Sequence, residues 1–227
     1  MQIKLLFIIA NSDKKIEKVV NKFKLPFNVM TKAMGTASES LLNFFGLNAR
    51  EKYVSMSIIP DSMEEDILLN LNDMLKINNI GNGLAFTINL SSSSKYVMDA
   101  FNDKVGENME EEKKVKKTRK TKKEEKNYHL VITIVDVGCA EKVMNAAKRK
   151  GATGGTIING RELGGKNSFK FFNITMEAEK DIVLIVCEEK NKNDIMTEIL
   201  EKTGIKTEAK GLCISLPIEN VVGLIDN

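Results

Sequence analysis

Apolar and polar residues follow two kinds of spacing along this chain, and the two kinds recur in the same order in each half. Short, nearly continuous apolar runs are typical of buried strands, and apolar residues three or four positions apart are typical of helices that cover a sheet. The helical spacing is clearest at Ile16, Val19 and Phe23 in the first half and at Val143 and Ala147 in the second. The apolar runs predict strands at 3–10, 28–34, 52–59, 83–90, 129–136, 155–161, 181–188 and 211–218.

A second helix is expected between the third and fourth strand of each half. It should start after Asp61–Ser62, a good N-cap signal, and after Asn191. The resulting order, β-α-β-β-α-β, is that of the ferredoxin-like fold. We therefore predict an α+β protein with two tandem ferredoxin-like domains and antiparallel sheets. Each sheet should pack on another, within the chain or between chains, because its helix-free face would otherwise expose apolar residues.

Sequence matches between the two halves indicate an internal repeat. The segment EKVVNKFK, which starts at Glu17, matches EKVMNAAK, which starts at Glu141, at an offset of 124 residues. Further along, Lys52 and Lys180 match at an offset of 128 residues. An offset that is held over helical and strand segments predicts a duplicated unit.

A charged segment separates the halves. Between 104 and 126 there are ten Lys or Arg and six Asp or Glu, which leaves 24 basic and 25 acidic residues elsewhere. The net charge of +3 is therefore concentrated in this segment, and electrostatics do not favour nucleic-acid binding by the folded parts. We predict domains at 1–102 and 128–227, joined by a charged linker at 103–127. The alternative for the linker is a tail that binds nucleic acid or an acidic partner.

Several classes of protein are disfavoured by composition. There is no apolar run long enough to span a membrane. Three cysteines without CxxC spacing and the single His129 argue against a disulfide framework or a metal centre, and favour the cytoplasm. The glycine-rich stretch that starts at Gly151 precedes a strand, so it fits neither the dinucleotide fingerprint nor a Walker loop. With no paired acid and base in evidence, we expect a protein that is not an enzyme.

Two stretches resemble PII-type nitrogen regulatory proteins. AAKRKGATGGTIINGRELG is similar to the junction between the first helix and the second strand of that family, and GLCISLPIENVVGL is similar to its last strand and the continuation. GNGLAFTINL in the first half looks like the family's B-loop and last strand. The matches over 151–156 and 216–222 carry the resemblance, which covers about 100 residues in each half.

The resemblance implies a regulatory protein in nitrogen metabolism that senses a small molecule. Members of the family form trimers, bind ATP or ADP, and 2-oxoglutarate with magnesium, between subunits, and dock a long T-loop onto a target protein. By the same resemblance we expect a homo-oligomer with a small-molecule effector and a regulated protein partner, which could be an enzyme, a transporter or a regulator. The phosphate-binding cations of the family are largely absent, since Leu84 and Leu212 stand where it has lysine. The resemblance allows ATP or ADP as effector, but the usual binding mode is not expected: the pocket is empty, altered, or shared between the unlike halves. The candidate ligand-binding residues are Gly154, Gly155, Thr156, Gly164, Gly81, Asn82, Gly83, Lys210 and Gly211.

Aromatic residues in two polar loops are candidates for partner binding, namely Phe169, Phe171, Phe172, Phe44 and Phe45. Buried aromatic anchors often dominate protein interfaces. Two alternatives stay open at these positions: the aromatics cover the protein's own sheet, or they extend the second and third strands into a hairpin. For the whole protein, the alternative function is a degenerate PII-like scaffold that binds its partner without a nucleotide.

Overall fold

The structure is a computed structural model of the whole chain. It describes residues 2–25, 27–36, 51–77, 82–94, 97, 99–101, 127–161, 169–171, 174–176 and 179–224. The elements of the first half are β1 (Ile3–Ala10), α1 (Asp13–Lys22), β2 (Asn28–Gly35), β3 (Glu51–Pro60), the 3-10 turn η1 (Asp61–Met63), α3 (Glu64–Leu75) and β4 (Gly83–Asn89). Those of the second half are β5 (Tyr128–Asp136), α5 (Ala140–Arg149), β6 (Thr156–Arg161), β7 (Phe169–Phe171), β8 (Ile174–Met176), β9 (Glu179–Glu188), α6 (Glu189–Thr203), β10 (Leu212–Ile218) and β11 (Val221–Val222).

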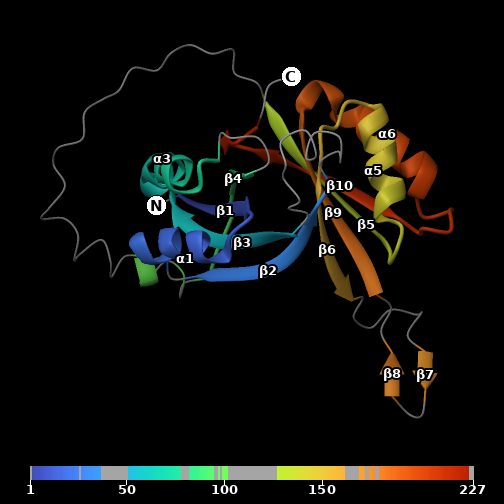
Figure 1. Cartoon of the computed structure of the whole chain (residues 1–227), viewed down its shortest axis with the longest axis horizontal. Helices are drawn as coiled ribbons and strands as arrows, with labels where there is room; N and C mark the ends of the chain where they lie inside the picture. Colours follow the sequence, from blue (N-terminus) through green and yellow to red (C-terminus); the bar gives the residue numbers. More distant parts are fainter. Residues whose placement is uncertain are drawn as a thin grey trace, which may run out of the picture.

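The expected α+β architecture is confirmed, with one addition. Each half has the ferredoxin-like strand order, β2-β3-β1-β4 in the first and β6-β9-β5-β10 in the second, with antiparallel neighbours. The two sheets are not separate, because β2 pairs with β6 and joins them into one nine-stranded sheet. Figure 1 shows α1 and α3 beside the strands of the first half and α5 and α6 beside those of the second.

Helix starts follow the sequence only in part. The α1 helix begins as its pattern predicts, with Ser12 as N-cap accepting a hydrogen bond from the Lys15 amide. The expected cap at Asp61–Ser62 is wrong, because these residues form the turn η1 and α3 begins at Glu64 without a side-chain cap. The start after Asn191 is also wrong. There α6 follows β9 directly and begins at Glu189.

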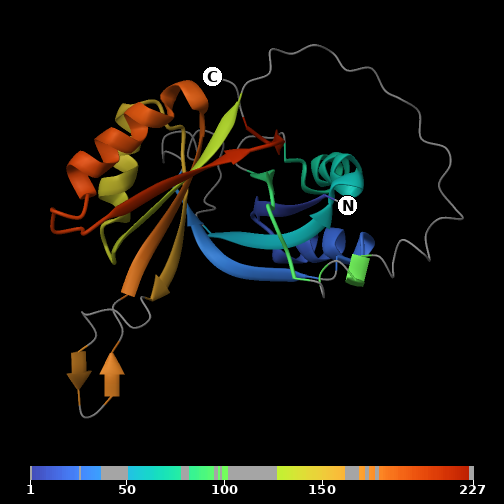
Figure 2. The same ribbon diagram turned by 180° about the vertical axis from the view of Figure 1, so that it is seen from behind.

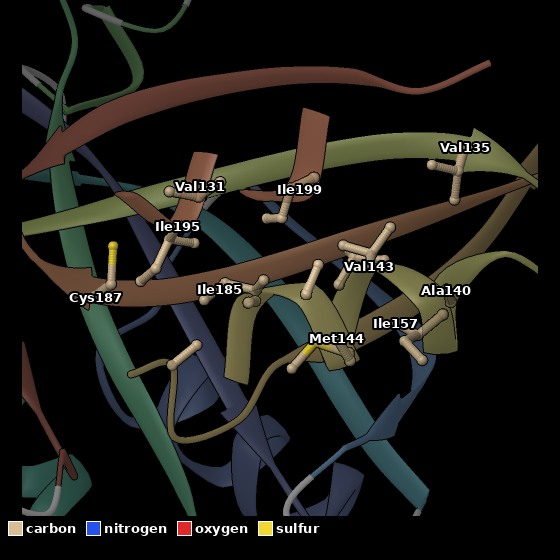
Figure 3. Close-up of a cluster of buried hydrophobic side chains, with 14 of the residues drawn as sticks. Val131, Val135, Ala140, Val143, Met144, Ile157, Ile185, Cys187, Ile195 and Ile199 are labelled. Carbon is tan, nitrogen blue, oxygen red and sulfur yellow. The ribbon is translucent and has the colours of Figure 1, made fainter. Parts of the chain in front are cut away.

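Three apolar clusters hold the layers together. One lies between α1, α3 and the first half of the sheet, and another between α5, α6 and the second half. Figure 3 shows the latter, with Val143 and Met144 of α5 and Ile195 and Ile199 of α6 directed at Ile185 and its neighbours on the strands. The third cluster combines helix-free faces of both halves, for example Phe7, Phe86 and Leu130. The helix-free faces were expected to be covered, and they pack on each other within the chain, as two halves of one sheet and not as two sheets.

The C-terminal segment crosses from one half to the other. After β10 leaves β5 at Ile218, the Glu219 amide donates to the Thr87 carbonyl and the Thr87 amide donates to the Asn220 carbonyl, each at 3.0 Å. The short strand β11 then pairs with β4, at the far edge of the sheet. Figure 2 shows this path, in which β10 runs from the second half toward β4. The C-terminal segment thus pairs with both halves, through β10 in the second and through β11 in the first.

Candidate functional site

The predicted ligand-binding stretch at the start of β6 lies where the two halves join. The Thr36 hydroxyl donates to the Gly155 carbonyl at 2.9 Å and accepts from the Gly155 amide at 2.8 Å. The Thr36 amide also donates to the Gly155 carbonyl at 2.9 Å, and Lys148 Nζ donates to the Thr36 carbonyl at 3.0 Å. The backbone groups of Gly155 are therefore bonded to the first half of the same chain.

Close packing surrounds the same stretch. A Cβ on Gly155 would lie 2.7 Å from Met144 Sδ and 2.9 Å from the Leu184 carbonyl oxygen, so only glycine fits here. Thr156 is buried, opposite Leu184 on β9. Gly154 is half-buried beside this joint, and Gly164 lies outside the described residues.

The predicted glycine turn of the first half supports the C-terminal segment. Gly83 has a positive φ of 141°, and a Cβ there would lie 2.0 Å from the Ile9 carbonyl oxygen. A Cβ on Gly223 would lie 2.6 Å from the Gly83 carbonyl oxygen, so the two backbones are in close contact. The side-chain amide of Asn82 donates to the Lys76 carbonyl at 3.0 Å, and Gly81 lies outside the described residues.

In the second half, the equivalent turn belongs to a charged cluster. Lys180 Nζ lies 2.6 Å from Asp136 Oδ1, and Lys210 Nζ lies 3.7 Å from Asp136 Oδ2. The hydrogen bond from Lys180 lowers the pKa of Asp136 below its usual value, and it outweighs the opposing effect of burial. Gly211 anchors the turn, because its amide donates to the Thr203 carbonyl at 2.6 Å. We call Asp136, Lys180 and Lys210 the Asp136 cluster.

The first half has a different pair at the same place in its sheet. Asp136 is opposite Lys180 in the β5–β9 ladder, and Asn11 follows Ala10, which is opposite Tyr53 in the β1–β3 ladder. Lys52 Nζ donates to the Asn11 side-chain carbonyl. Burial lowers the pKa of Lys52 to about 8. At equivalent positions, Lys180 of the second half is thus bonded to a carboxylate and Lys52 of the first half to a side-chain amide.

A two-stranded hairpin, β7–β8, stands in the loop between β6 and β9. It forms a sheet of its own and extends away from the nine-stranded sheet in both views (Figures 1 and 2). Phe169 is opposite Met176 and Phe171 is opposite Ile174 in its register. Since alternate positions share one face of a strand, these four apolar positions share one face of the hairpin. Phe172, Phe44 and Phe45 lie outside the described residues.

Thr36, Asp136 and Lys180 take part in the contacts described above but were not predicted as site residues from the sequence. The match between Lys52 and Lys180 was a usable signal, because it placed a lysine at the start of the third strand of both halves. Within the described part of the chain, no group of three or more His, Cys, Asp or Glu is placed to hold a metal ion. No helix in that part is long and apolar enough to cross a membrane.

Comparison with known proteins identifies structural matches at low TM-scores. No family model matches the chain, and no curated protein matches its sequence. Arabidopsis thaliana PII bound to citrate matches with 20% identity and a TM-score of 0.30, covering 40% of this chain and 73% of that one. B. subtilis GlnK in complex with ATP matches with 15% identity and a TM-score of 0.32, covering 40% and 82%. CPII from Thiomonas intermedia K12, bound to ADP, AMP and acetate, matches with 18% identity and a TM-score of 0.31, covering 44% and 91%.

Proposed function

We propose that this chain is a PII-like regulatory protein without enzymatic activity. It controls a protein partner, in nitrogen metabolism by its resemblance, through the loop that contains the β7–β8 hairpin. An anionic small molecule of the adenine-nucleotide class acts as its effector at the Asp136 cluster. The observation that supports this best is the hairpin, which stands apart from the main sheet and has four apolar positions on one face.

The hairpin favours a docking role for a physical reason. An isolated two-stranded hairpin is marginally stable in water, and an apolar face gains stability when it is covered. A partner that covers Phe169 and Phe171 would order the hairpin and bury two aromatic side chains, which commonly contribute strongly to binding. Docking would therefore be coupled to the conformation of the loop.

The Asp136 cluster is suitably placed to influence that loop. Lys180 is the second residue of β9, the strand that follows the loop, and Lys210 lies in the turn before β10. A phosphate group could compete with Asp136 for both lysines, since charge-assisted bonds to phosphate are strong. Such an effector would regulate docking only if it binds two loop conformations with different affinity.

The effector is tested by calorimetric titration of the full chain with ATP, ADP, AMP and cyclic nucleotides, together with thermal-shift measurements. Binding of one nucleotide is expected, and Lys210→Ala should weaken it. Lys190→Ala is the matched control, because Lys190 is exposed and pairs with Glu188 at 2.5 Å, outside the cluster. Absence of both heat and thermal shift with every nucleotide would disprove the effector.

The docking role is tested separately with a photo-crosslinking amino acid at position 170 or, as control, at position 190. In cells, a specific partner should be captured from position 170 and not from position 190. Equal capture from both positions, or none from either, would contradict docking through the hairpin. Mass spectrometry of the cross-linked peptides would identify the partner.

The degenerate scaffold is the second candidate, and two contacts favour it. The Gly155 backbone is bonded to Thr36, and Asp136 already partners both lysines of its cluster. This scaffold would give cross-links from position 170 and no response to any nucleotide. The two experiments together therefore separate the candidates.

A further inference from the structure

The outer strand of the second half, β10, leaves an apolar stripe at the surface. Leu212, Ile214 and Leu216 are 58%, 45% and 37% exposed. They occupy alternate positions, so they share one face of the strand. Between them, Cys213 packs against the helix-side cluster on the opposite face. The stripe therefore lies on the helix-free face.

This stripe continues a buried interface. Ile218, at the end of the same strand, belongs to the cluster where the helix-free faces of the two halves meet, together with Leu130 and Leu184. In the first half, Phe86 and Ile88 of the corresponding strand, β4, are buried in that cluster. The helix-free face of β4 is thus covered by the second half, whereas the same face of β10 extends beyond the first half and stays exposed.

The edge of β10 is also available for pairing. Among the described strands β10 pairs with β5 alone and is the terminal strand of the sheet. Residues 212–216 include no charged residue, although charges and prolines are the usual protection of an edge strand. Pro217 follows them and limits the stretch that could pair. An unprotected apolar edge of this kind is a template for another strand.

From these observations we infer that β10 is the contact surface for a second copy of this chain, joined edge to edge as an antiparallel β10–β10 pair. The stripe is symmetric about Ile214, so a two-fold axis there places Ile214 opposite its own copy and Leu212 opposite Leu216 of the other chain. A two-fold interface requires such a self-complementary patch. The apolar face buried inside each chain would then continue across the axis. This inference is independent of the proposed function.

The first experiment measures the mass of the full chain by light scattering and sedimentation velocity. The expected mass is twice the 25.3 kDa of one chain. Ile214→Lys should raise the dimer dissociation constant at least about 100-fold, because each dimer would bury two unpaired ammonium groups. Leu69→Lys is the matched control. Leu69 is equally exposed, at 58%, but lies on α3, so the dimer should persist.

Circular dichroism establishes that both variants fold. A monomeric wild-type chain at its highest soluble concentration would overturn the inference, and would mean that the stripe is covered by this chain itself or by another protein. A dimer that survives Ile214→Lys would overturn it equally.

A second experiment tests the register and does not depend on a disruptive substitution. A short bismaleimide should cross-link Ile214→Cys to itself. It should also cross-link Leu212→Cys to Leu216→Cys in mixed samples more efficiently than either variant to itself, because opposite positions in a ladder are closest. Peptide mass spectrometry would distinguish these links from those of the native cysteines, with Leu69→Cys as control. Cross-links at Leu69→Cys alone, or none, would contradict the pairing.

Discussion

Removal of the buried cation Lys4 should strongly destabilise the protein. Lys4 Nζ lies 2.6 Å from Glu64 Oε2 and 2.9 Å from Asp61 Oδ1, and the side chains of Lys4 and Glu64 are only 6% and 10% exposed. Glu64 also accepts hydrogen bonds from Thr87 and from the side chain of Asn220. The network therefore joins β1, α3 and β4 to the C-terminal segment of the second half.

The expected loss of stability on substitution of Lys4 or Glu64 follows from the different numbers of charged partners that the two residues have. In the described part of the chain, Glu64 is paired with one cation, whereas Lys4 is paired with two carboxylates. Lys4→Met leaves a buried carboxylate with hydrogen bonds but no opposite charge, which should cost about 3 kcal/mol. Glu64→Gln leaves Lys4 with Asp61 and should cost about 1 to 2 kcal/mol. Lys4→Met should therefore be the more destabilising variant.

Urea denaturation monitored by circular dichroism gives the free energy of unfolding of each variant. Lys142→Met serves as control, because Lys142 and Glu208 form an exposed pair at 3.9 Å that should contribute little. A cost below about 1 kcal/mol for Lys4→Met, or a larger cost for Glu64→Gln, would refute the reasoning.

The same network makes stability depend on pH in two windows. Burial raises the pKa of Glu64, but the hydrogen bonds from Lys4, Thr87 and Asn220 together lower it below the usual 4.5. The contribution of Glu64 is therefore present above about pH 4.5 and is lost as the pH falls through its lowered pKa. For Lys4, burial lowers the pKa and its bonds to Glu64 and Asp61 raise it above the usual 10.5, so its contribution is present below 10.5 and is lost at higher pH. The difference in stability between wild type and Lys4→Met should be constant near neutral pH and shrink in acid.

Three further predictions concern the joint and Lys52. Gly155→Ala should cost about 1 to 3 kcal/mol of stability, because its methyl group would overlap Met144. Gly160→Ala should cost less, because its methyl group would lie 3.2 Å from the end of the Ile182 side chain; denaturation of both variants gives the two values. Thr36→Val should cost about 1 to 3 kcal/mol through loss of the hydroxyl bonds to Gly155, and Thr36→Ser should restore most of it in the same assay. Lys52 should titrate near pH 8 in NMR of the lysine ε-carbons, with its signal assigned by a Lys52→Gln variant. The free energy of unfolding should rise with pH between about 8 and 10.5, because the unfolded chain binds the Lys52 proton more tightly in that range. Titration of Lys52 near 10.5 would contradict its burial.

The local pattern of the sequence was sufficient for the longer strands, for the helices α1, α3, α5 and α6, and for their order, but not for the short strands β7, β8 and β11. Ile16 and Val19 in α1, and Val143 and Ala147 in α5, are buried as their helical spacing predicts. The expected N-cap at Asp61–Ser62 and the helix start after Asn191 were wrong, although α3 does begin after Ser62, at Glu64. After β3 ends at Pro60, Asp61–Met63 form the turn η1, and α3 follows at Glu64 without a side-chain cap.

Contacts between the halves could not be predicted from periodicity. The pairing of β2 with β6, and of β11 with β4, depends on which strand edges meet after folding, and alternation of apolar residues does not specify this. Thr36 is the clearest case. It is a threonine at the end of a strand, without distinctive spacing, yet its hydroxyl bonds both polar groups of the Gly155 backbone.

Residues at equivalent register positions of the two halves have different partners. Lys4 is opposite Ile59 in β3, and His129 is opposite Cys187 in β9, which is 128 residues after Ile59. Lys4 has two carboxylates there, whereas His129 Nε2 lies 3.8 Å from Glu189 and its buried Nδ1 has no hydrogen-bond partner among the described residues. At the other end of the same strands, the lysine meets an amide in the first half and a carboxylate in the second. The Lys4 network of the first half and the Asp136 cluster of the second therefore lie at opposite ends of equivalent strands. The network of the first half attaches the C-terminal segment and that of the second lies beside the hairpin loop, so stability and regulation are expected to depend on different halves.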